Sequence, residues 1–262
     1  MKKNVARNQV VIASKVYFNE GRLSRQAIMR EIDGTLSRLG TDYLDLYIIH
    51  RFDYDTPIEE TMEALHDLVK AGKVRALGAS AMYGYQFYNM QLAARDNGWT
   101  PFSAMENHYN LLYREDEREL LPICKQMKVS LMPYSPLAAG HLARPQWKSE
   151  SLRGTTDRVA MGKYDKTEAE DMQIVKRVAE LAEKYNCKMS QIAIAWQWAK
   201  GILSPIIGAT KTKYLDDSAG AFDIKLTAED LAYLEEPYVP HEIVGAIDKN
   251  PAQGVILLDE KK

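Results

Sequence analysis

The chain has 262 residues, of which 46% are hydrophobic and 27% charged, and its formal net charge at pH 7 is −2. This length suffices for one large domain, and the evenly spread charge disfavours nucleic acid or an anionic membrane as a partner. No apolar run approaches the ~20 residues that cross a bilayer, and no secretory signal follows the basic start. Cys124 and Cys187 lack metal-type spacing, so we predict reduced core thiols in a soluble cytoplasmic protein.

Short β-rich runs alternate along the chain with longer amphipathic runs. We predict strands at 10–16, 43–50, 74–80, 102–107, 129–134 and 203–208. We predict helices at 24–39, 57–71, 84–97, 114–127, 168–185 and 190–200, with start and stop signals at Ser24, Thr56, Gly40 and Gly72. The runs LDLYIIH and VRALGAS are nearly continuous in apolar residues, as expected for strands buried on both faces. This pattern predicts an α/β fold of repeated βα units around a parallel sheet.

Two segments break the alternation of strands and helices. Residues 138–167 form a polar, Arg/Lys-rich loop after the fifth strand, and residues 237–262 form a tail without clear periodicity. Long loops in compact domains are usually functional or disordered. Because no stretch has the composition of a linker, we predict a single domain over residues 1–262.

Two neighbouring strands each end in a basic residue: Lys15 ends the first and His50 ends the second. The carboxyl ends of parallel strands are where α/β barrels build their active sites. A cation and a titratable imidazole in that position suggest catalysis at an oxygen atom. The alternatives are that Lys15 is a solvated strand terminus and that His50 is a core histidine paired with Arg51 and Asp53.

The later strands end in features typical of nucleotide binding. In MPYSPLAAG, the Tyr134 ring suits stacking on a heterocycle, and the small residues after it leave backbone amides open to phosphate. In PIIGATK, Gly208 permits close backbone approach, and Thr210 and Lys211 lead into a helix whose N-terminus favours anions. The alternatives are a core role for Tyr134 in an ordinary turn and a helix N-cap at Thr210.

Together these segments resemble successive units of the aldo-keto reductase family, over about residues 9–245. The resemblance is carried by LSRQAIMREIDGTLSRLGTDYLDLYIIHRFDYDTPIEETMEALHDLVKAGKVRALGAS, GWTPFSAMENHYNLLYRE, MPYSPLAAGHLARP and PIIGATK. It implies a barrel of the (β/α)8 TIM type and NADPH-dependent reduction of a small aldehyde or ketone to an alcohol by hydride transfer. It is closest to the bacterial branch related to potassium-channel β subunits.

The resemblance also implies roles for individual residues. Lys15 matches the lysine that lowers the pKa of a catalytic tyrosine, and His50 matches the histidine that orients the substrate carbonyl. Ser80 and Glu106 match residues that hold the nicotinamide carboxamide, and Tyr134 matches the aromatic that stacks on the nicotinamide ring. The pyrophosphate-binding loop is matched by Ser135, Pro136, Leu137, Gly140 and Arg144. The segment that holds the adenosine 2′-phosphate, which implies NADPH rather than NADH, is matched by Gly208, Thr210, Lys211 and Asp217.

Four positions depart from the family pattern. Ala81 stands where many members carry Asn or Arg, and Glu106 puts a carboxylate where a glutamine amide is expected. Tyr214 and Ser218 replace a Gln and an Asn that help to fix the adenosine. These positions lie within or beside the predicted cofactor contacts.

The resemblance begins at the family's third βα unit. The two earlier units carry the catalytic aspartate and the tyrosine that protonates the carbonyl, and neither Tyr17 nor Tyr54 occupies the matching place. We therefore predict a barrel truncated at its N-terminus to about six βα units, or an open sheet, with little carbonyl reductase activity. Three hypotheses follow: an ordinary reductase read from an internal start, a nucleotide-binding or regulatory protein without turnover, and an assembly in which copies associate through exposed barrel edges.

Overall fold

The structure is a computed structural model that describes residues 4–148, 157–245 and 247, and the statements below concern these residues. They divide into two compact units. The first contains the described residues up to Glu106 together with Ile123–Val129, and the second contains Asn107–Pro122 and the described residues from Ser130 onward. Parts of the predicted loop 138–167 and most of the predicted tail 237–262 lie outside the described residues. The predicted single domain stays a prediction.

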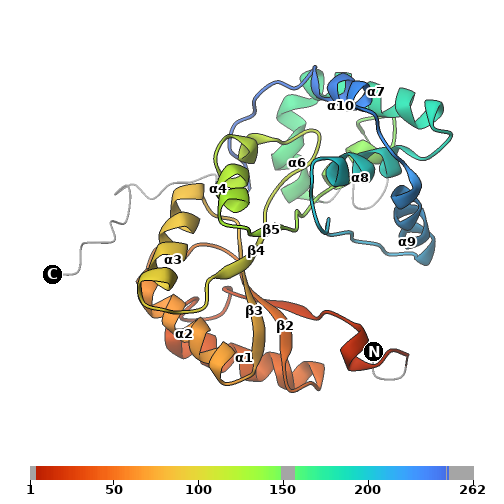
Figure 1. Ribbon diagram of the computed structural model, residues 1–262. Helices are drawn as coiled ribbons and strands as arrows, with labels where there is room; N and C mark the ends of the chain where they lie inside the picture. The colour runs from red at the N-terminus through yellow and green to blue at the C-terminus, as the bar shows by residue number, and fades with distance from the viewer. Residues whose placement is uncertain (1–3, 149–156, 246, 248–262) are drawn as a thin grey trace. The chain divides into compact units, whose positions relative to one another are not determined.

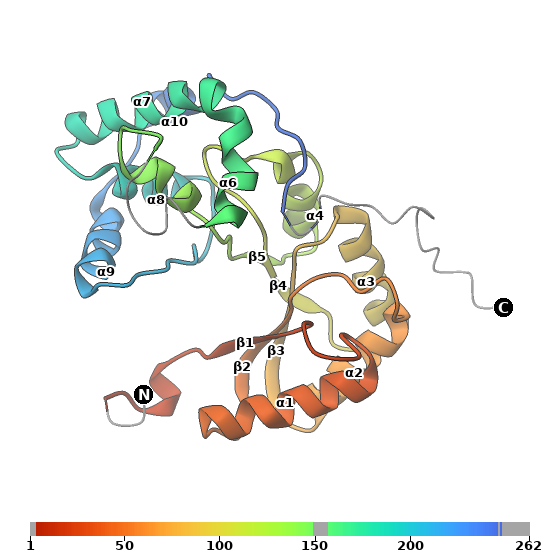
Figure 2. The same ribbon diagram turned by 180° about the vertical axis from the view of Figure 1, so that it is seen from behind.

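The first unit is a parallel sheet accompanied by three helices. The strands follow the order β1 (Ala13–Val16), β2 (Leu44–Ile49), β3 (Val74–Ser80) and β4 (Phe102–Glu106). Each of the first three strands is followed by a helix: α1 (Arg25–Leu39), α2 (Ile58–Lys70) and α3 (Gly84–Asp96). Figure 1, and Figure 2 from behind, show these helices side by side along the outside of the strands. The predicted βα repeat with a parallel sheet is confirmed in this unit.

Local signals in the sequence set the helix ends. The Ser24 hydroxyl accepts a hydrogen bond from the Ala27 amide at 3.4 Å, which confirms Ser24 as the N-cap of α1. Gly40 ends α1 with a left-handed φ of 61°. Helix α2 has Pro57 rather than Thr56 as its N-cap, and Glu59 in its first turn suits the positive end of the helix dipole.

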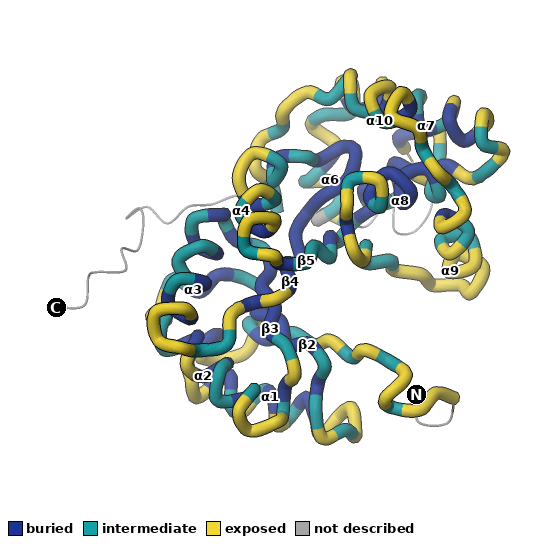
Figure 3. Tube along the Cα trace, in the orientation of Figure 1, coloured by how far each residue is buried: buried dark blue, intermediate teal, exposed yellow. Residues whose placement is uncertain are grey.

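One face of the sheet is packed against the helices. Val16 pairs with Ile49, Ile49 pairs with Ala79, Ala79 pairs with Met105, and all four side chains are buried. Figure 3 shows the same pattern, with buried strands and exposed outer turns of the helices. Successive side chains on a strand point to opposite faces. The residue next to each of these four therefore points to the other face of the sheet.

The second unit is mainly helical. Its helices are α6 (Arg158–Tyr164), α7 (Glu168–Lys184), α8 (Met189–Ala199), α9 (Thr212–Ala219) and α10 (Ala228–Glu235). Shorter pieces are β5 (Ser130–Leu131) and the 3-10 helices η2 (Glu115–Arg118), η3 (Ala138–Ala143), η4 (Asp165–Thr167) and η5 (Gly220–Asp223). Trp196 lies fully buried in the core of this unit, and its indole N–H donates to Glu235 at 2.8 Å. Trp196 thereby joins α8 to α10.

The predicted strands at 129–134 and 203–208 are largely wrong. Only Ser130–Leu131 of the first is a strand, and residues 203–208 form none. The Ser204 amide donates to the Leu131 carbonyl at 3.4 Å, and the Ile206 amide donates to the Pro133 carbonyl at 2.8 Å. Pro133 has no N–H to return a hydrogen bond, so the reciprocal half of a parallel ladder cannot form. The described residues thus contain five strands where six were predicted.

Smaller corrections concern helices and cysteines. The predicted helix at 114–127 is two pieces, η2 and α4 (Leu120–Gln126), because Glu119 between them has a non-helical φ of −140°. Helices α6 and α10 were not predicted. Cys124 is buried as expected, whereas Cys187 is only half-buried, and neither forms a disulfide with a described residue. Among the described residues, no helix has the length and apolar character needed to cross a bilayer.

Candidate functional site

Four predicted site residues share one face of the first unit's sheet. Ser80 pairs with Glu106, and Lys15 pairs with Ile48, two residues before His50. The register therefore puts Lys15, His50, Ser80 and Glu106 on the face opposite the helices, at or near the carboxyl ends of their strands. We call these four residues the strand-end group. Their placement agrees with the sequence prediction, although their roles stay predictions.

Lys15 and Glu106 form an ion pair across this face. The Lys15 Nζ lies 3.0 Å from the Glu106 Oε2, and the two side chains are 31% and 8% exposed. In a flat sheet, strands three places apart would lie about 14 Å from one another. The contact therefore shows that the sheet is curved, with this face on its concave side, as in a barrel. From the sequence, Lys15 is predicted to act in catalysis and Glu106 to contact the nicotinamide carboxamide. In the structure the two side chains contact one another.

Burial dominates the electrostatics of Glu106. It raises the pKa of the Glu106 carboxyl, and the opposing effect of the Lys15 ammonium does not cancel that rise. The net result is a carboxyl group that holds its proton to a higher pH than a solvated glutamate does.

His50 is half-buried and lies against an aromatic ring. The Phe18 ring meets the imidazole edge-on at 4.8 Å, and the Arg51 guanidinium lies 5.0 Å from the Phe18 centroid. The pKa of His50 is lowered by burial first, and then by the charges of Lys15 and Arg51. A neutral imidazole has one N–H donor and one acceptor nitrogen, so His50 can donate a hydrogen bond to an oxygen atom at neutral pH.

Replacing Lys15 with methionine should raise the pKa of His50, because the substitution removes a positive charge that opposes imidazole protonation. An NMR titration of the histidine ring protons measures this shift, with His50→Gln identifying the resonance. Lys73→Met is the matched control, since Lys73 is a lysine of the same unit that pairs with Asp33. An unchanged His50 titration in Lys15→Met would contradict the prediction.

Tyr17 and Tyr54, the tyrosines that follow Lys15 and His50 in the sequence, both contact residues other than Lys15. The Tyr54 hydroxyl accepts a hydrogen bond from the Gln86 amide at 3.0 Å. The Tyr17 ring packs edge-on against Phe18, with their centroids 5.3 Å apart. These contacts tie both tyrosines to neighbours other than Lys15.

In the second unit, Tyr134 ends a stack of three rings. It lies parallel to His108 with centroids 5.2 Å apart, and the other neighbour of His108 in the stack is Tyr113, at 4.2 Å. The Lys163 ammonium is 4.7 Å from the Tyr134 centroid. His108 is nearly fully buried and shares a 2.7 Å hydrogen bond with the Tyr164 hydroxyl. Sequence reasoning missed His108, for which the available signal was its place two residues beyond the end of β4.

The predicted pyrophosphate loop has an unusual backbone. Left-handed φ angles occur at Ser135 (58°), Ala138 (46°), Ala139 (57°) and Gly140 (100°). Gly140 suits its φ of 100°, a conformation that residues with a Cβ rarely adopt, and a Cβ there would lie 2.8 Å from the Arg144 guanidinium, which would have to shift. Pro136 and Leu137 lie between the left-handed residues, and Leu137 has φ −99° and ψ 13°. A right-handed residue followed by a left-handed one is the geometry of an anion-binding nest. Here the Ala138 amide already donates to the Ser135 carbonyl at 2.9 Å, and the Gly140 amide donates to the Leu137 carbonyl at 2.7 Å.

Arg144 holds the shape of this loop. Its guanidinium donates to the backbone carbonyls of Gly140 and Gln146 at 3.1 Å and to that of Trp147 at 3.2 Å. Burial lowers its pKa. In this structure Arg144 organises the loop around it.

The predicted adenosine segment lies at the start of α9. Gly208, Thr210 and Lys211 are exposed, and a Cβ at Gly208 would meet no atom within 4 Å. The N-cap of α9 is Lys211, so the alternative of an N-cap at Thr210 is wrong. Asp217 forms an ion pair with Lys188.

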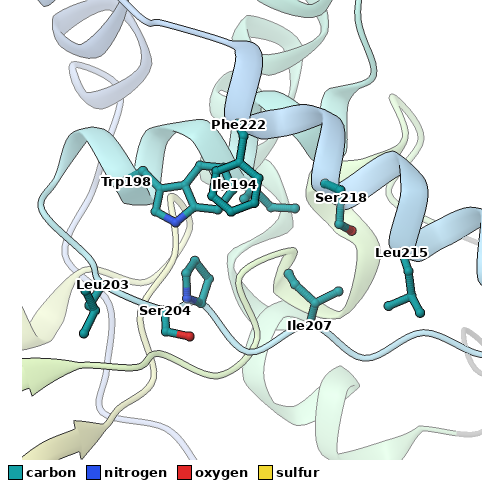
Figure 4. Close-up of a pocket in the computed structure, with 10 residues that line it drawn as sticks. Ile194, Trp198, Leu203, Ser204, Ile207, Leu215, Ser218 and Phe222 are labelled. Atoms are coloured by element: carbon teal, nitrogen blue, oxygen red, sulfur yellow. The ribbon is translucent and has the colours of Figure 1, made fainter. Parts of the chain in front are cut away.

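A pocket of about 230 Å³ lies beside this segment (Figure 4). The Trp198 and Phe222 rings stack there with centroids 4.0 Å apart. The lining is mainly apolar and consists of Ile194, Trp198, Leu203, Ser204, Pro205, Ile207, Leu215, Ser218, Ala219 and Phe222. Of the positions that the family uses for the adenosine, Ser218 lines this pocket, whereas Gly208, Thr210, Lys211 and Asp217 do not.

Comparisons with known proteins agree on one family. The chain is 46% identical to an aldo-keto reductase of Fusarium vanettenii over 88% of this chain and 62% of that protein. It is 41% identical to the versiconal hemiacetal acetate reductase of Aspergillus parasiticus, over 92% of this chain and 77% of the relative. It is 44% identical to a putative aryl-alcohol dehydrogenase of Schizosaccharomyces pombe, over 87% of this chain and 64% of the relative.

A solved structure agrees with the fold. The crystal structure of a thermostable aldo-keto reductase in complex with the inhibitor epalrestat has a TM-score of 0.73 and 28% sequence identity to this chain. The match covers 90% of this chain and 74% of that one. It confirms the predicted fold of the TIM-barrel type.

The chain spans less than two thirds of the Fusarium and Schizosaccharomyces relatives. Its sequence nevertheless matches the Aldo/keto reductase family over residues 1–238. Together with these relatives, that match shows that the chain belongs to the aldo/keto reductase family.

Proposed function

We propose that this chain is the cofactor- and carbonyl-binding part of an NADPH-dependent oxidoreductase that reduces a small aldehyde or ketone to its alcohol. The observation that carries the proposal is that Lys15 and His50 lie on one concave face of the sheet, at or near the carboxyl ends of neighbouring strands. Active sites of barrel enzymes are built at that end of the strands.

In this proposal His50 and Lys15 act on the substrate oxygen. When bound, NADPH supplies a hydride to the carbonyl carbon, and negative charge then develops on the carbonyl oxygen. The neutral His50 ring donates a hydrogen bond that orients that oxygen. In this proposal the same His50 proton passes to the oxygen to complete the alcohol, and solvent returns a proton to the ring. The Lys15 ammonium stabilises the charge, which is the kind of electrostatic assistance that a low-dielectric site makes effective.

The residues proposed to hold the cofactor fit its chemistry. The Tyr134 ring is suited to stacking, and the turn at Leu137 and Ala138 would offer a phosphate oxygen its backbone amides other than that of Ala138, which donates to the Ser135 carbonyl. Ser135, Pro136 and Gly140 shape that loop, and Arg144 supports it. The exposed ammonium of Lys211, at the N-terminus of α9, is suited to a 2′-phosphate. Ser80 remains a proposed contact to the carboxamide.

Substituting Lys211 with methionine should weaken NADPH binding about tenfold and leave NADH binding nearly unchanged, because only NADPH carries the 2′-phosphate. The increase in NADPH fluorescence on binding measures both affinities. Lys213→Met is the matched control, since Lys213 is an exposed lysine in the first turn of the same helix. An equal loss for both cofactors would remove the case for NADPH preference, and a wild-type chain that binds neither cofactor would refute the proposed function.

A second candidate is an NADP(H)-binding or regulatory protein without turnover. The contacts of Lys15, Tyr17 and Tyr54 favour it, because Lys15 pairs with a carboxylate and the phenols pack elsewhere. Steady-state assays with an aromatic aldehyde separate the candidates: cofactor binding without NADPH consumption supports the second.

The bacterial branch, the cytoplasmic location and the association of copies through barrel edges stay predictions. Light scattering tests the association.

A further inference from the structure

We propose that Glu106 is a positioning residue whose carboxylate holds the Lys15 ammonium over the concave face of the sheet. This inference rests on the proposed function, which gives Lys15 its part in stabilising charge on the substrate oxygen. It differs from the role that sequence resemblance implies for Glu106, which is a contact to the nicotinamide carboxamide.

The first argument is the geometry of the pair. Lys15 and Glu106 come from strands three places apart, yet their charged atoms are 3.0 Å apart. A lysine ammonium on a flexible stem has no fixed position of its own. Glu106 is 8% exposed and sits at the end of β4 in register with buried Ser80. The anchored carboxylate therefore fixes the position of the mobile ammonium.

The second argument is the chemistry of the carboxylate. Among the described residues, Glu106 Oε2 is buried and has Lys15 as its charged neighbour, with no further hydrogen-bond partner. A buried carboxylate oxygen is costly to leave unpaired. A glutamine would keep the shape but not the charge, so Glu106→Gln distinguishes an electrostatic partner of Lys15 from a carboxamide contact.

The test is competitive labelling of lysines with limiting acetic anhydride, in which peptide mass spectrometry gives a rate for each lysine. Removing the carboxylate should raise the Lys15 labelling rate about tenfold in Glu106→Gln, because the amine is then no longer held in the ion pair and can turn toward the reagent. Glu106→Asp, which keeps the charge at a greater distance, should give an intermediate rate. If the Lys15 labelling rate in Glu106→Gln stays within about twofold of wild type, the proposal is overturned. A change of that size is what removal of an exposed ion pair would give.

A matched control is available in the same unit. Asp33→Asn removes the carboxylate from Lys73 in a pair whose side chains are 62% and 36% exposed. Solvent screens such a pair, so the Lys73 rate should change by less than about twofold. A change at Lys73 as large as that at Lys15 would mean that loss of any carboxylate has this effect, and it too would overturn the proposal.

The reciprocal variant keeps the proposal testable if Glu106→Gln does not fold. In Lys15→Met the pKa of Glu106 should rise further, since the lysine charge lowers it in the wild type. Carbon-13 NMR of labelled glutamate carboxyls measures this, and an unchanged titration overturns the proposal. Neither measurement uses cofactor or substrate. A chain that shows the coupling but binds no NADPH would therefore refute the proposed function and leave the ion pair established.

Discussion

Alanine in place of Asp53 should lower the free energy of unfolding by about 3 kcal/mol. The Asp53 carboxylate is almost fully buried and accepts hydrogen bonds from the Leu23 and Asp55 amides at 3.1 Å and from the Thr56 hydroxyl at 2.7 Å. Removing the carboxylate leaves these two amides and the hydroxyl without their acceptor, at a buried position that water reaches poorly. Urea denaturation measures the change.

Asp55→Ala is the matched control for this prediction. Asp55 and Asp53 both contact the Arg22 guanidinium, but the Asp55 side chain is 76% exposed and that of Asp53 only 2%. An exposed ion pair contributes at most about 1 kcal/mol. If the two variants lose similar stability, burial of the Asp53 network is not the cause. Asp53 follows His50 by three residues, so this network also holds the segment that carries the imidazole.

Asparagine in place of Asp116 should stabilise the protein by about 2 kcal/mol at pH 7.5 and have a smaller effect near pH 4. Burial raises the pKa of Asp116 to about 6, although the Asn107 amide donates to its carboxylate at 2.8 Å. The folded state therefore binds the proton more tightly than the unfolded chain does. The stability that this protonation provides is fully present below about pH 4 and is lost as the pH rises through 6.

The asparagine side chain in Asp116→Asn would not titrate and would still offer an oxygen to Asn107, so the difference between variant and wild type should grow between pH 4 and 6. Urea titrations at several pH values measure it. Asp96→Asn, at an exposed aspartate beside Arg95, is the control and should leave the pH profile unchanged. A stability difference that does not depend on pH would contradict this explanation.

Much of the first unit can be predicted from the sequence because its signals are local. The strand predicted at 74–80 agrees with β3, and the helix predicted at 24–39 agrees with α1 to within one residue. Continuous apolar runs mark strands covered on both faces, and Ser24 and Gly40 mark the helix ends. The second unit was harder to predict. The strand predicted at 203–208 would have to pair with the segment that contains Pro133, which cannot donate its half of the hydrogen bonds. Residues 203–208 alone do not show which segment they would pair with.

The sequence predicts which residues form the candidate site, but it does not predict their contacts with one another. The ends of strands identified Lys15 and His50, the family resemblance added Ser80, and the structure puts all three on one face. The Lys15–Glu106 pair joins residues 91 positions apart. It depends on how strongly the sheet curves, and no local sequence pattern reports curvature. The stacking of Tyr134 on His108 was missed for the same reason, because it is a tertiary contact.

The left-handed backbone of the loop from Ser135 to Gly140 has a consequence for binding rates. Three of its four left-handed residues carry side chains, and each such conformation is unfavourable by about 1 kcal/mol or more. The folded protein holds them in place with help from the Arg144 bridges to nearby carbonyls. A ligand that docks there would meet a backbone whose shape is already set, so we expect diffusion and charge to govern how fast it associates.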